Sequence, residues 1–175
     1  LPNLTETARQ TREHDKILGS IVTIWTPQRF LHDALWPAVD YAAAMLKKQG
    51  YVPLAETLPS FAKTFYGFEP SATWINAMQT LFDHTPMRRP WVAAMRLETG
   101  DDLQGIDLQQ EANCWQEVHD VLAGSRDDVT DNAEAYDTLV LMIRMMRHVW
   151  LRLLKFNQNT CDESLLAESQ AIEKA

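Results

Sequence analysis

Three of the five histidines in this 175-residue chain are followed directly by an aspartate, a pairing that can hold a metal ion. The pairs are His14–Asp15, His32–Asp33 and His119–Asp120. Helical metal-dependent phosphohydrolases combine such a pair with further His and Asp ligands. Only His32–Asp33 has an apolar context, between Leu31 and Ala34. The pattern therefore leaves one alternative open, a metal-dependent phosphohydrolase that uses His32 and Asp33.

The rest of a catalytic site is not evident around these pairs. Neighbouring residues on a helix point about 100° apart, so the two members of a pair cannot easily share one ion. Cys114 and Cys161 form no C-x-x-C motif, and whether they are bonded to each other stays open. The six glycines form neither a G-x-G-x-x-G nor a Walker pattern. We predict no metal site, no cofactor and a non-catalytic role rather than an enzyme.

The segment from Ala133 to Phe156 is long, contains no Gly or Pro, and has two different faces. Apolar residues such as Leu139, Ile143 and Met146 recur at helical spacing on one side. The opposite side carries cations three and four residues apart, which could bind an acidic helix or a polyanion together. Two structural explanations remain open. The cations suit the carboxyl end of a helix dipole, and neighbouring acidic loops could neutralise them. This basic face consists of Arg144, His148, Arg152 and Lys155, with Arg147 at its edge.

A second basic group lies in the sequence Arg88-Arg89-Pro90-Trp91. Proline is favoured at the first position of a helix, which would place both arginines at the positive end of the helix dipole. A bound carboxylate or phosphate would resolve this conflict, and Trp91 could add a flat apolar contact. The alternative is that Asp83 or a distant glutamate of the same chain neutralises Arg88 and Arg89.

The overall charge disfavours nucleic acid as the partner. The formal net charge is −8 at pH 7 and the sequence pI is near 5.0, whereas binding to phosphates needs a concentrated positive field. Nucleic-acid binding through the local basic face remains a second alternative. Charged residues interrupt every apolar run before the ~20 residues that span a bilayer. We therefore predict a cytoplasmic protein without a transmembrane segment.

Periodicity and helix-ending residues predict a single all-α domain over residues 1–175. Gly67 and Gly124 each follow a helical stretch, and Pro37 should kink or split a helix over residues 26–49. The longest helix should run from about Thr130 to Asn157. We expect it to be the centre of an irregular bundle of six to eight helices.

These observations favour a protein–protein interaction or adaptor module that receives an acidic or amphipathic segment of a protein partner. The chain begins at Leu1 rather than Met and shows no signal peptide, which indicates a processed protein or a piece of a larger one. It could then be a subunit or domain of a larger assembly, and its oligomeric state stays open. The predicted partner-binding residues are Arg144, Arg147, His148, Arg152, Lys155, Arg88, Arg89 and Trp91.

Overall fold

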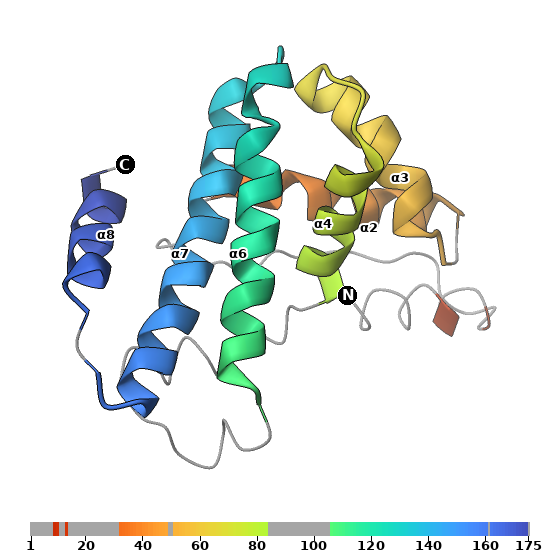
Figure 1. Ribbon diagram of the computed structural model, residues 1–175. Coiled ribbons are helices and arrows are strands. Elements are labelled where there is room, and N and C mark those ends of the chain that lie inside the picture. The colour runs from red at the N-terminus through yellow and green to blue at the C-terminus, as the bar shows by residue number, and fades with distance from the viewer. Residues whose placement is uncertain are drawn as a thin grey trace.

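The computed structural model describes residues 9–10, 13, 32–48, 51–83, 106–160 and 162–174. This part of the chain is all-α and contains no strand, which confirms the predicted fold class (Figure 1). Two short 3-10 helices, η1 (His32–Leu35) and η4 (Arg126–Asp128), and a π-helical turn, η2 (Ala62–Tyr66), join the longer elements. The described α-helices are α2 (Trp36–Lys48), α3 (Leu54–Phe61), α4 (Ala72–Asp83), α6 (Leu108–Gly124), α7 (Ala133–Asn157) and α8 (Glu163–Lys174).

Helix α7 is the centre of the described structure, as the sequence predicts. It runs beside α6 along most of its length, while α4 packs on α6 and η1 packs on α7 (Figure 1). Its apolar face is the core, because Leu139, Ile143 and Leu153 are completely buried. Burying each such side chain stabilises the fold by about 1.5–3 kcal/mol. This burial fixes the rotation of α7 about its axis and therefore turns its cationic residues away from α6.

Local sequence signals determine where several of these helices begin. The Asp107 carboxylate accepts hydrogen bonds from the backbone N–H groups of Gln109 and Gln110, both at 3.0 Å, and so caps α6. Helix α2 begins at Trp36, directly after η1 ends at Leu35, and the start of the helix predicted over residues 26–49 lies outside the described residues. Pro37 thus lies in the first turn of α2, where its missing N–H breaks no helical hydrogen bond.

The turn after η2 is fastened to the start of α7. The N–H groups of Thr130 and Asp131 both donate to the carbonyl oxygen of Tyr66, and the Thr130 hydroxyl donates to that of Gly67. Gly67 has a φ of 75°, and a Cβ atom there would lie 2.1 Å from the Thr130 hydroxyl oxygen. Only glycine fits this position. The close approach holds Phe65, at the end of η2, beside the first turn of α7.

The hydroxyl of Tyr136 connects three helices inside the core. The indole N–H of Trp74, on α4, donates to this hydroxyl at 3.0 Å, and the hydroxyl donates to the carbonyl oxygen of Leu122, on α6, at 2.9 Å. Burial raises the pKa of Tyr136 to about 12, so the phenol remains protonated and able to donate. One side chain of α7 thereby satisfies two buried polar groups on its neighbours.

We expect Tyr136→Phe to lower the free energy of unfolding by about 2 kcal/mol, because the Trp74 indole and the Leu122 carbonyl would then be buried without a partner. Urea denaturation of the purified protein measures this loss. Tyr51→Phe is the matched control, since the Tyr51 side chain is 66% exposed and should lose almost nothing. Equal stability of Tyr136→Phe and the unaltered protein would show that this hydroxyl does not join the helices.

Candidate functional site

Helix α8 lies along the basic face of α7, on the side away from α6 (Figure 1). A short turn after α7 reverses the chain, and α8 then runs back antiparallel to it. Pairs of interacting residues show this direction, because Lys155 faces Asp162 whereas Arg144 faces Glu168. The basic face is therefore an interface within the chain along at least three turns of α7.

The carboxylate of Glu168 binds two arginines of α7 at once. Arg144 makes a two-pronged contact, with its Nε at 2.7 Å from one carboxylate oxygen and a terminal nitrogen at 2.9 Å from the other. Arg147 donates to the first of these oxygens at 2.8 Å. The hydrogen bonds from Arg144 hold the pKa of Glu168 below its usual value, and Glu168 in turn raises the pKa of Arg144. The carboxylate is thus ionised over the whole neutral range.

His148 is covered by the same helix. Its side chain is only 6% exposed, and its Nε2 lies 2.7 Å from the hydroxyl oxygen of Ser169. Burial is the main cause of a lowered pKa for His148, and the nearby Arg152 adds to it. Glu168 acts in the opposite direction, while Arg147 and Arg144 lower the pKa further. The imidazole is therefore neutral near pH 7, so it adds no positive charge to the face.

The two remaining cations of the face are held less firmly. The Lys155 ammonium lies 3.8 Å from the Asp162 carboxylate, and both side chains are about one-third exposed. Arg152 is exposed to solvent. The carboxylate of Asp162 also accepts a hydrogen bond from the backbone N–H of Ser164 at 2.9 Å, so Asp162 is the N-cap of α8. The carboxyl end of α7 is thus the more accessible part of the basic face.

The binding role predicted from the sequence requires that the cations of the basic face are open to solvent and not paired within the chain, and this arrangement corrects that expectation. The expectation is wrong for Arg144, Arg147 and His148, because Glu168 and Ser169 lie over them. The sequence interpretation had left open that acidic loops of the same chain neutralise the cations. Asp162, in the turn before α8, does so loosely for Lys155, but the carboxylate that pairs with the two arginines comes from a helix. The role of these residues in binding a partner is not tested by this geometry and stays a prediction.

The other predicted site residues cannot be placed. Arg88, Arg89 and Trp91 lie outside the described residues. The backbone of His32 belongs to η1, and the Asp33 carboxylate accepts a hydrogen bond from the indole N–H of Trp36. Within the described parts of the chain no three His, Cys, Asp or Glu side chains gather closely enough to hold a metal ion. The phosphohydrolase alternative therefore has no ligand set in these segments.

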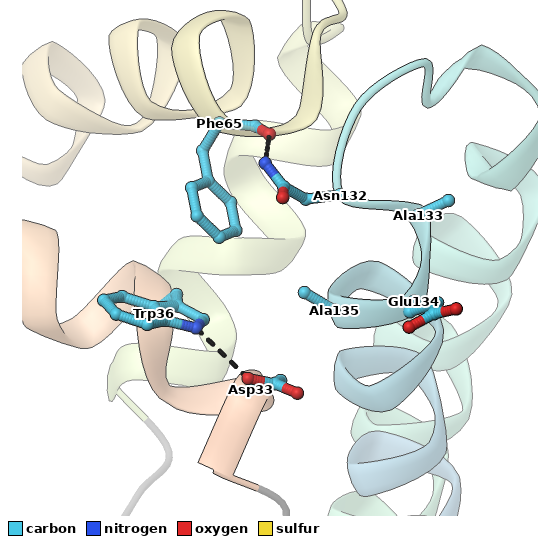
Figure 2. A pocket seen from close by; sticks show the side chains of 7 residues that line it. All are labelled: Asp33, Trp36, Phe65, Asn132, Ala133, Glu134 and Ala135. Carbon is cyan, nitrogen blue, oxygen red and sulfur yellow. Dashed lines mark hydrogen bonds between the residues drawn. The ribbon is translucent and has the colours of Figure 1, made fainter.

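A pocket near the start of α7 was not anticipated from the sequence. It has a volume of about 460 Å³ and lies where η1 and α2 meet η2 and α7 (Figure 2). The sequence interpretation did not single out Trp36, and it considered Asp33 only as half of a possible metal-binding pair. An exposed aromatic residue beside a proline could have been a signal for it. We call it the Trp36 pocket, lined by Asp33, Trp36, Phe65, Asn132, Ala133, Glu134 and Ala135.

Comparisons of this chain with protein-family models, with curated proteins and with solved structures give no match. No helix in the described segments is both long enough and apolar enough to cross a membrane. A function can therefore be proposed only from the contacts, burial and charges of the chain itself.

Because His148 is buried and neutral, we expect the stability of the folded chain to depend on pH. Its pKa in the folded chain lies below the ordinary value of 6.5 that the unfolded chain recovers, so unfolding takes up a proton. The stability associated with His148 is thus complete above about pH 6.5 and is lost as the pH falls towards the folded pKa. We expect the melting temperature to fall between about pH 7.5 and pH 5.5, and His148→Gln to reduce this fall.

Differential scanning calorimetry over this pH range measures the slope, with His119→Gln as the matched control. His119 lies on α6, where its Nδ1 is 3.2 Å from the exposed Asp120 carboxylate. If His148→Gln kept the full pH dependence of the unaltered protein, another group would be responsible for it.

Proposed function

We propose that this chain is a non-catalytic interaction module whose basic face on α7 binds an acidic amphipathic helix of a partner protein. The observation that supports this most directly is the carboxylate of Glu168, which is shared by Arg144 and Arg147. In this contact, a helix of the same chain places a carboxylate on the basic face, and an acidic partner helix would place the same group there. Arginine forks match the geometry of carboxylates, which they bind in this two-pronged way.

The looseness of α8 supports exchange with a partner. Helix α8 has no buried residue and supplies none of the residues of the hydrophobic core. Its Leu166 side chain is 63% exposed. Solvent-exposed ion pairs contribute only about 0–1 kcal/mol, so the partly buried Glu168 contact must hold much of this helix in place. Local opening of α8 would therefore uncover the face without unfolding α6 and α7.

A partner must compete with α8, which is tethered to the face by a short turn. Such tethering corresponds to an effective concentration of about 1 mM, so a partner helix needs contacts that α8 does not make. Arg152 and Phe156 provide them, because they are four residues apart on α7 and both are exposed, Phe156 to 45%. A partner with one acidic residue in place of Glu168, a second acidic residue near Arg152 and an apolar residue near Phe156 would have an advantage.

A fluorescence anisotropy titration with a labelled peptide tests this proposal. The probe is a peptide of residues 160–175 with Cys161→Ser, which carries the α8 sequence in trans. Glu168→Gln in the full chain should weaken the docking of its own α8 and tighten peptide binding by about tenfold, because charge-assisted hydrogen bonds are lost only within the chain. Adding Arg144→Ala and Arg147→Ala to this variant should abolish binding.

Arg126→Ala is the matched control for the arginine variants. Arg126 is also paired with a carboxylate, Asp137, but it belongs to η4 and lies outside the basic face. A peptide affinity that is unchanged by Glu168→Gln, or that persists when Arg144 and Arg147 are replaced by alanine, would contradict the proposal. A polyanion such as single-stranded nucleic acid, added instead of the peptide, would support the nucleic-acid alternative if it bound more tightly and with a steeper dependence on salt.

A further inference from the structure

We propose that the Trp36 pocket binds an alkylated ammonium cation, the group present in choline and in N-methylated lysine side chains. This site is separate from the basic face and does not depend on the function proposed for it. The pocket volume of about 460 Å³ lies within the range of small-molecule sites, about 300–1,000 Å³. Its lining residues include two aromatic residues, two acidic residues and small apolar ones; in Figure 2 the Asp33 carboxylate lies beside the Trp36 ring, and that of Glu134 lies beyond Ala135.

The aromatic walls come from Trp36 and Phe65. Their ring centroids are 5.8 Å apart and their planes are inclined by 38°, so the two rings form an open angle rather than a closed stack. The Trp36 side chain is 44% exposed, which leaves ring surface available to a ligand. Cations with methyl groups bind to such ring faces because the π-electrons are attracted to the charge and the methyl groups are apolar. In Figure 2, Ala135 points from α7 towards Trp36 and adds a small apolar wall.

The polar side chains of the pocket are mainly hydrogen-bond acceptors. The Trp36 indole N–H donates to the Asp33 carboxylate at 3.3 Å, which orients the ring and places a negative charge beside it. The Asn132 amide N–H donates to the Phe65 carbonyl oxygen at 2.6 Å, so its amide oxygen is left as an acceptor. Glu134 is a second acidic residue at the edge of the pocket, farther from the rings than Asp33, and no Lys, Arg or His is among the seven lining residues (Figure 2). This charge pattern complements a cation.

One feature of the pocket favours the opposite charge. Residues 133–135 are the first residues of α7, and Asn132 gives this helix no side-chain cap, so the positive end of the helix dipole borders the pocket. The acidic residue in the first turn, Glu134, offsets this field. A quaternary ammonium, as in choline and trimethyllysine, has no N–H group and therefore needs no hydrogen-bond acceptor, which suits a pocket whose main contacts are aromatic ring faces. Anion binding is the competing outcome of the test.

Nuclear magnetic resonance titration of the full chain can follow the six tryptophan indole N–H signals. The signal of Trp36 is assigned by its absence in Trp36→Leu. Choline and N-acetyl-trimethyllysine amide are the probes, and 3,3-dimethylbutan-1-ol is the neutral molecule of the same shape as choline. We expect both cations to shift the Trp36 signal selectively and to bind at least about fivefold more tightly than the neutral alcohol. Tighter binding of the lysine derivative would indicate that the natural ligand is a methylated lysine of a protein. Tighter binding of choline would indicate a small free molecule with a quaternary ammonium group.

Two variants and their matched controls complete the test. Asp33→Asn removes a charge but retains an oxygen that can accept from the Trp36 indole, and it should weaken choline binding several-fold. Trp36→Leu should reduce choline affinity about tenfold, measured by calorimetry. Tyr51→Leu and Glu69→Gln, which replace an exposed aromatic residue and an exposed carboxylate outside the pocket, should leave it unchanged. Equal binding of the neutral alcohol, undiminished binding in both pocket variants, or displacement of choline by sulfate would overturn the proposal.

Discussion

One carboxylate, that of Glu168, lies between two guanidinium groups of the central helix, and the account of the basic face depends on it. Arg144 and Arg147 cannot turn far from this position, because the apolar side of α7 is locked into the core. Their side chains are only 29% and 16% exposed, so removing the carboxylate would leave two poorly hydrated charges side by side. Losing one partner of such a group costs more than the contact itself contributes. The face therefore requires an anion, either from α8 or from a partner.

Helix α7 organises both proposed sites, but at different ends and by different means. At its amino end, hydrogen bonds to the turn at Gly67 hold Phe65 and Asn132 in place and so shape the Trp36 pocket. These hydrogen bonds join segments far apart in sequence, and the buried Tyr136 connection supports the same end of α7. Along its carboxyl half, α7 is covered by a helix without buried residues. We expect a preformed site at one end and an exchangeable one at the other.

The sequence was sufficient for the features that depend on local physics. The all-α fold and the span and apolar side of α7 follow from periodicity and helix-ending residues. The cover over the basic face did not follow, because a helical wheel shows which residues point away from the core but not which segment packs there. An acidic helix that follows a basic one after a short turn could have been the signal. The Trp36 pocket needed tertiary structure, since its walls come from elements far apart in sequence.

Hydrogen–deuterium exchange of the full chain tests most directly whether α8 is a separable cover. The amides of α8 should exchange far faster than those of α6 and α7, and Glu168→Gln should accelerate exchange in α8 while leaving the two core helices protected. Exchange of α8 only at the slow rate of α6 and α7, with no selective effect of the substitution, would show that α8 belongs to the cooperative core. The basic face would then not be available to another molecule.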